Sequence, residues 1–138
     1  DKITNHNNIS TGCISFTNLN QIYKYCDEKT INIKNIEHIY IDEAQFFPDL
    51  EEIVSNLLNA YSKLKITCVG LDGDYQQNVF NDGQLLKLIS KAEIVTKLSS
   101  KCYMCEENAF FTKRTSNDKI QIIVGSKDIY VPSCYIHK

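Results

Sequence analysis

Two short-spaced pairs of potential metal ligands lie near the C-terminal end of the sequence. Cys102 and Cys105 form the first pair, and Cys134 and His137 form the second. Three thiolates and one imidazole fill the four positions of a tetrahedral Zn²⁺ site and leave none open, so this spacing predicts a structural zinc ion. The alternative is a redox disulfide between Cys102 and Cys105. The thioredoxin arrangement requires a helix that begins at the first cysteine, and the residues here do not favour one.

A second candidate site consists of two adjacent acids, Asp42 and Glu43, which follow the apolar run at 39–41. Ligands gather at the carboxyl ends of strands in open α/β sheets. A strand ending in an acid is typical of the Walker-B pattern, whose Asp reaches Mg²⁺. The next acid can then serve as a general base. Taken alone, the pattern fits two solvated acids or a helix N-cap equally well.

The elements around these acids predict a strand–helix–strand unit in a single chain of 138 residues. The β-branched run at 39–41 is typical of a buried strand. A helix over 49–64 and a second strand at 66–71 follow, joined by a right-handed crossover that makes the strands parallel. Apolar residues recur at helical spacing along the predicted helix: Leu50, Ile53, Val54, Leu57, Leu58, Tyr61 and Leu64.

The remaining elements are shorter. Residues 1–15 are polar and without a period, so we expect a flexible lead-in. A helix capped by Thr17 follows, with one apolar face: Leu19, Ile22, Tyr23 and Cys26. Further predicted elements are a helix at 83–91, a strand at 93–99, and antiparallel strands at 107–115 and 119–125.

Composition excludes several classes of partner. The net charge of −2, with mixed signs, gives no electrostatic argument for nucleic acid or a membrane surface. This weakens a third interpretation, a zinc-ribbon module that binds nucleic acid. No apolar stretch approaches the roughly 18 residues that span a bilayer. Cys13, Cys26 and Cys68 have no obvious mates and are interpreted as reduced thiols of an intracellular protein.

Several motifs in order resemble those of the thymidine kinases of cellular and poxviral type. They are I-D-E-A-Q-F-F-P-D at 41–49, L-D-G-D-Y-Q-Q at 71–77, C-Y-M-C at 102–105, F-T-K-R at 111–114 and V-G-S-K-D-I-Y at 124–130. The resemblance covers nearly all of the chain from about Ile36. It implies an α/β fold with a P-loop-kinase-like parallel sheet and a small zinc-ribbon subdomain. We expect the kinase core at 1–98 and the ribbon at 99–138.

The resemblance also implies an activity, the transfer of the γ-phosphoryl group of ATP to the 5′-hydroxyl of thymidine or deoxyuridine. Asp42 would hold Mg²⁺, Glu43 would accept the hydroxyl proton, and Arg114 would meet the charge that develops on the phosphate. The resemblance also implies a cytoplasmic protein that assembles as a homotetramer or homodimer.

A nucleoside pocket is implied in the same way. Its residues would be Phe46, Leu71, Tyr75, Phe80, Thr112, Val124, Ser126, Asp128 and Tyr130. Without the resemblance, a plain turn at 72–73 and a core position for Tyr130 would be the favoured interpretations. Ser126, Lys127 and the histidine at the fourth metal position depart from the family pattern.

The sequence contains no G-x-x-x-x-G-K-[ST] stretch, the phosphate-binding loop with which the family begins. We therefore expect this chain to be a fragment that lacks the N-terminal part of the sheet and is incomplete for activity. The alternative is a non-catalytic homologue that binds nucleosides or partner proteins.

Overall fold

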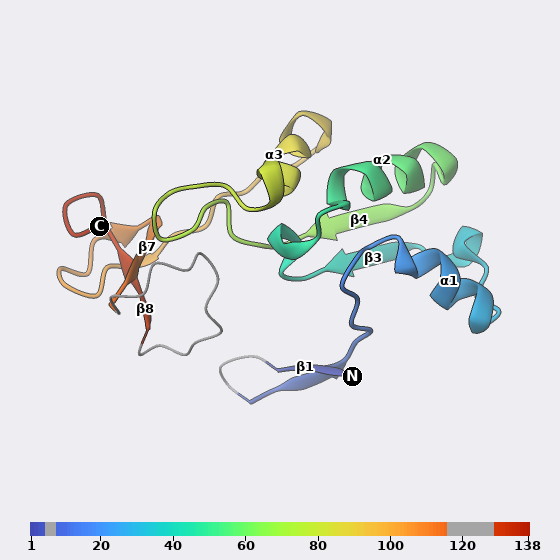
Figure 1. The fold of residues 1–138 in the computed structure, drawn as a ribbon, viewed down its shortest axis with the longest axis horizontal. Helices are drawn as coiled ribbons and strands as arrows, with labels where there is room; N and C mark the ends of the chain where they lie inside the picture. The colour runs from blue at the N-terminus through green and yellow to red at the C-terminus, as the bar shows by residue number, and fades with distance from the viewer. Residues whose placement is uncertain (5–7, 116–128) are drawn as a thin grey trace.

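The computed structural model describes residues 1–4, 8–115 and 129–138. Its centre is a strand–helix–strand unit made of β3 (His38–Ile41), α2 (Leu50–Ala60) and β4 (Lys65–Cys68). The two strands are parallel, with His38 opposite Lys65 and Ile41 opposite Cys68. Their carboxyl ends point toward the β7–β8 end of the molecule (Figure 1). The predicted unit is confirmed, although β4 ends three residues earlier than the predicted 66–71.

Helix α2 covers one face of this strand pair because its apolar residues fall on one side. Four of them are buried: Leu50, Ile53, Val54 and Leu57. Leu58 was expected on the same side, but 38% of its surface is exposed. The helix ends at Ala60, earlier than the predicted 64, and Leu64 is buried beyond it in the connection to β4.

Helix α1 (Gln21–Glu28) begins later than predicted, and the expected cap by Thr17 is wrong. The side-chain oxygen of Gln21 accepts hydrogen bonds from the main-chain N–H groups of Thr17 and Asn18 instead. The carboxylate of Asp49, expected to begin α2, accepts from the N–H groups of Leu19 and Asn20. A residue distant in sequence therefore satisfies the donors before α1 and ties it to the start of α2. A 3₁₀ turn, Ile33–Asn35, then leads into β3.

The N-terminal residues form a hairpin where a flexible lead-in was expected. Strands β1 (Lys2–Thr4) and β2 (Ser10–Gly12) are antiparallel, and all their residues are exposed. The hydroxyls of Thr4 and Ser10 are 2.8 Å apart across the pair. Backbone pairing makes the hairpin without any buried apolar pattern, so its sequence carries no periodic signal of a strand.

The segment after β4 contains short helical pieces: Asn81–Gly83, α3 (Gln84–Lys87) and Ile89–Lys91. The predicted helix at 83–91 is thus present but broken. The predicted strand at 93–99 is wrong, because residues 92–99 adopt no regular element. Ile94 and Leu98 are 85% and 80% exposed. Their apolar pattern suits a strand, but no described strand lies beside them to pair with.

Two small hairpins make up the C-terminal part. Strand β5 (Ser100–Lys101) pairs with β6 (Asn108–Ala109), and β7 (Phe111–Arg114) pairs with β8 (Tyr130–Ser133). The predicted strand at 107–115 is therefore two short strands. The predicted strand at 119–125 lies outside the described residues. The fold is mixed α/β with short sheets, and the larger parallel sheet and the zinc ribbon stay predictions.

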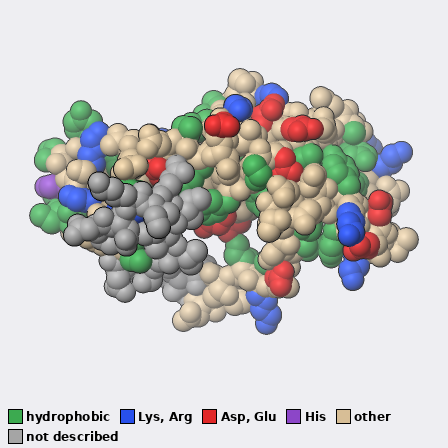
Figure 2. Space-filling model, viewed as in Figure 1, with side chains coloured by type: hydrophobic (Ala, Val, Ile, Leu, Met, Phe, Trp, Pro, Cys, Tyr) green, Lys and Arg blue, Asp and Glu red, His purple; other side chains and the backbone are tan. Residues whose placement is uncertain are grey.

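No helix in the described ranges is long and apolar enough to span a bilayer. Acidic and basic side chains are interspersed over the face shown in Figure 2. Most buried apolar residues of the described ranges fall into two groups, a larger one within 19–88 and a smaller one made of Cys102, Ala109 and Cys134.

Candidate functional site

The four predicted metal ligands come together at the tip of the C-terminal part. Their ligand atoms all lie within 4.8 Å of one another. The distance from Cys105 Sγ to Cys134 Sγ is 3.7 Å. His137 Nδ1 lies 3.5 Å from Cys102 Sγ and 3.3 Å from Cys134 Sγ. In a tetrahedron with Zn–S of about 2.3 Å, sulfur atoms are about 3.8 Å apart and sulfur and nitrogen about 3.6 Å apart. The cluster therefore has the donor set and spacing that suit zinc.

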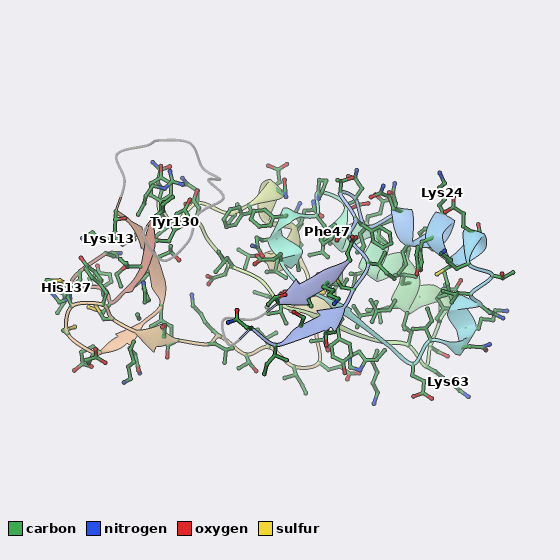
Figure 3. The ribbon with its side chains drawn as sticks, turned by 90° about the horizontal axis from the view of Figure 1, so that it is seen from below. Lys24, Phe47, Lys63, Lys113, Tyr130 and His137 are labelled. Carbon is green, nitrogen blue, oxygen red and sulfur yellow. The ribbon has the colours of Figure 1, made fainter. Side chains whose placement is uncertain are left out.

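Each ligand pair lies in a turn attached to a hairpin. Cys102 follows β5, and its N–H donates to the carbonyl of Glu107, which closes the first turn. Cys134 follows β8, and its carbonyl accepts from the N–H of His137. The N–H of Tyr103 donates to Pro132 of β8, joining the two turns. Figure 3 shows His137 beside sulfur atoms at the far tip, with Tyr130 toward the other end of the same hairpin.

The surroundings of Cys102 favour its thiolate. Burial of the side chain opposes ionisation, but the N–H groups of Met104 and Cys134, together with His137, lower its pKa to about 6. A metal binds the deprotonated form, so these contacts prepare Cys102 as a ligand. All six cysteines are free thiols, and the alternative of a Cys102–Cys105 disulfide is not formed.

The two acids after β3, Asp42 and Glu43, differ in backbone conformation. Asp42 is exposed directly after the strand. Glu43 adopts a left-handed conformation, φ 50° and ψ 38°, at the start of the 3₁₀ turn Ala44–Phe46. The left-handed region is uncommon for residues other than glycine, asparagine and aspartate, and such positions gather at functional sites. Both acids lie where ligands of parallel sheets are expected.

Gln45 is a site residue that the sequence interpretation missed. Only 1% of it is exposed. Its amide nitrogen donates to Glu43 Oε2 over 2.7 Å, and its amide oxygen accepts from the N–H of Leu71 over 3.0 Å. A glutamine among acids and aromatics has no periodic signature. The one sequence feature that could have indicated this role is the position of Gln45 in the turn that directly follows the two acids.

Three of the expected pocket residues, Phe46, Leu71 and Phe80, lie in or beside the 3₁₀ turn Ala44–Phe46. The rings of Phe46 and Phe80 meet edge to face, with centroids 5.6 Å apart. Phe80 is buried, whereas Phe46 and Leu71 are 41% and 47% exposed. The side-chain amide of Asn81 donates to the carbonyl of Gln45, which holds the Phe80 segment against the turn.

The C-terminal hairpin contributes Arg114, which is buried at the end of β7. Its guanidinium carbon lies 3.8 Å from the ring centroid of Tyr75 and 5.0 Å from that of Tyr130. It also donates a hydrogen bond to the Tyr130 hydroxyl. Thr112 lies on the same strand, opposite Pro132. Tyr75, Arg114 and Tyr130 thus lie together.

The whole sequence, residues 1–138, matches the family model for thymidine kinase. The chain belongs to the thymidine kinase family.

Individual relatives agree with this assignment. The chain is 32% identical over 137 residues to a thymidine kinase of Oryza sativa subsp. japonica, covering 99% of this chain and 49% of that protein. It is 35% identical to thymidine kinase a of Arabidopsis thaliana over 137 residues, covering 99% and 56%. It is 34% identical to the thymidine kinase of vaccinia virus (strain Ankara) over 137 residues, covering 96% and 75%. The chain spans about half the length of these plant relatives.

Three residues that the thymidine kinase resemblance places in the pocket lie outside the described residues: Val124, Ser126 and Asp128. Their roles stay predictions, as do those of the pocket and catalytic residues that the structure does describe. For the latter, the structure supplies positions and contacts.

Proposed function

We propose that the protein containing this chain transfers the γ-phosphoryl group of ATP to the 5′-hydroxyl of thymidine. The observation that carries the proposal is the acid-bearing turn at the end of β3. Glu43 is held by the buried amide of Gln45, and the aromatic pair of Phe46 and Phe80 lies beside it. A carboxylate next to aromatic faces can address a hydroxyl while the rings hold a planar base.

In this proposal Glu43 accepts the proton of the 5′-hydroxyl. The hydroxyl oxygen then forms a bond to the γ-phosphorus, the bond from that phosphorus to the β–γ bridging oxygen breaks, and ADP leaves. Asp42 offers the hard carboxylate oxygen that Mg²⁺ prefers, at an exposed position after β3. The ion would neutralise charge on the phosphates.

In the proposal Arg114 stabilises the negative charge on the transferred phosphate, since its planar guanidinium presents several hydrogen-bond donors at once. Its contacts with the rings of Tyr75 and Tyr130 hold that plane in one orientation. The proposed nucleoside pocket includes Tyr75, Leu71, Thr112 and Tyr130. The family resemblance adds Val124, Ser126 and Asp128 to it.

We also propose that the phosphate-binding loop lies in a longer form of the protein, because Asp42 and Arg114 cannot replace its row of N–H groups and its lysine. The zinc ion would be structural. Cytoplasmic localisation and assembly into a homotetramer or homodimer belong to the same proposal.

The deciding experiment compares the full-length protein with its Glu43→Gln variant in a thymidine phosphorylation assay. Glutamine keeps the shape but cannot accept the proton, so we expect kcat to fall about 10²–10⁴-fold with little change in KM. Glu37→Gln, an exposed acid just before β3, is the matched control and should keep full activity.

A Glu43→Gln variant with kcat within about threefold of the unaltered protein would rule out Glu43 as the base. A full-length protein that binds thymidine but never phosphorylates it would favour the non-catalytic homologue instead.

A further inference from the structure

Gln45 combines deep burial with hydrogen bonds to three separate segments. Its side chain reaches Glu43 at the end of β3 and Leu71 after β4, while its carbonyl accepts from Asn81. A buried amide is costly unless its donors and acceptors are satisfied, and here both ends of the amide have partners. All three segments carry residues of the proposed site.

The backbone makes room for this amide. A Cβ atom at position 70 would overlap the amide oxygen of Gln45 and would lie 3.1 Å from its main-chain nitrogen. Any larger residue at position 70 would therefore displace the Gln45 amide and crowd the backbone of the turn. Beyond Ile41, the N–H of Val69 donates to Ile41 and the N–H of Ala44 donates to Val69, which fixes the separation of the two strand ends.

Glu43 needs such a restraint. It is exposed and has a left-handed backbone, and a glutamate side chain has several rotatable bonds whose fixing costs conformational entropy. The Gln45 donor binds Oε2 at 2.7 Å, which leaves Oε1 for a second partner. A carboxylate that is fixed through one oxygen presents the other in a defined direction.

We propose that Gln45 is a positioning residue that orients the Glu43 carboxylate for the hydroxyl of the nucleoside and sets the adjoining pocket wall at Leu71. The inference rests on the proposed function, in which Glu43 is the base. Gln45 itself contacts no reacting atom. Removing the Gln45 side chain is therefore expected to lower kcat more than thymidine affinity, because misplacing a catalytic group by about 1 Å can lower the rate about 100-fold.

The test uses two variants of the full-length protein. Gln45→Met keeps the side-chain length but removes both hydrogen bonds, and we expect kcat to fall about 10–100-fold with the thymidine KM within about threefold. Gln45→Glu keeps an acceptor for the Leu71 N–H but sets a second carboxylate against Glu43. It should lower kcat by a similar factor, and it carries the test if Gln45→Met fails to fold.

The matched control is Gln84→Met. Gln84 also accepts a hydrogen bond from a main-chain N–H, that of Glu51 at 3.1 Å, but it lies in α3, outside the proposed site. This variant should keep its kcat whatever it loses in stability. A loss of kcat in both Gln45 variants but not in the control supports the inference.

Retention of kcat within about threefold in either Gln45 variant overturns the inference, and so does a loss confined to KM. An unaltered full-length protein without thymidine kinase activity would instead overturn the proposed function. The two failures are therefore distinguishable in one set of assays.

Discussion

The Tyr75 ring packs on the Arg114 guanidinium, but its hydroxyl finds no hydrogen-bond partner among the described residues although it is shielded from water. The aromatic face is useful there because it stacks on a planar cation, an interaction worth about 0.5–2 kcal/mol. The hydroxyl adds nothing to that stacking. An unsatisfied buried polar group costs about 1–3 kcal/mol.

Tyr75→Phe should therefore raise the free energy of unfolding by about 1 kcal/mol, since it removes the unpaired hydroxyl and keeps the ring. Urea unfolding followed by circular dichroism measures the change. Tyr103→Phe is the control, because Tyr103 is 44% exposed. It should leave stability unchanged. A loss of stability in Tyr75→Phe would mean that the hydroxyl has a partner in solution.

At the scale of elements, the C-terminal hairpins are too short to be stable unaided. Strands β5 and β6 contain two residues each, and β7 and β8 contain four. An isolated two-stranded hairpin is marginal in water. The small buried group of Cys102, Ala109 and Cys134 supplies little apolar area. A metal ion held by both turns would supply the stability that these elements lack.

Removing zinc should thus unfold the hairpins, since metal binding in small zinc domains supplies on the order of 10 kcal/mol. Elemental analysis should find about one zinc per chain. Treatment with a chelator should lower the midpoint of thermal unfolding, and added zinc should restore it. Zinc well below half an equivalent in native protein, or a disulfide between Cys102 and Cys105, would contradict the structural role.

The sequence predicted elements well wherever an apolar period coincided with burial. The stripe of α2 and the parallel strands beside it are examples, as is the cluster of four ligands, whose spacing alone indicates zinc. It failed where long-range partners decide the outcome. Asp49 binds the turn before α1, and residues 93–99 lack a described neighbour to make them a strand. Gln45 was missed for the same reason, since its role depends on segments distant in sequence.

At the scale of the whole molecule, the loop after β4 joins the α/β part to the C-terminal hairpins. Tyr75 packs on Arg114, and the ammonium of Lys138 donates to the side chain of Gln77 over 3.2 Å. The loop makes these links by contact, because the covalent connection between the two parts is residues 92–99, which are irregular and exposed. The stacked arginine is therefore a principal contact between the two parts.

Arg114→Met should loosen this junction, because methionine keeps apolar bulk but loses the planar charge that stacks on Tyr75. We expect chymotrypsin to cut after Leu98, which is 80% exposed, several times faster than in the unaltered protein. Intact-mass measurement over time follows the cut. Lys101→Met, an exposed position in β5, is the control and should not change the rate. An unchanged rate in Arg114→Met would show that other contacts hold the junction.

The meeting of three segments at Gln45 has a consequence for the order of folding. Gln45 contacts Leu71 across 26 residues and Asn81 across 36, whereas Glu43 is only two residues away. Contacts of long span require large loops to close, so they form after local turns. In a newly synthesised or partly unfolded chain, Gln45 lacks its hydrogen bonds to Leu71 and Asn81, so it is not yet fixed beside Glu43. Under the proposed function, the specific activity of a preparation would then report its fraction of fully folded molecules.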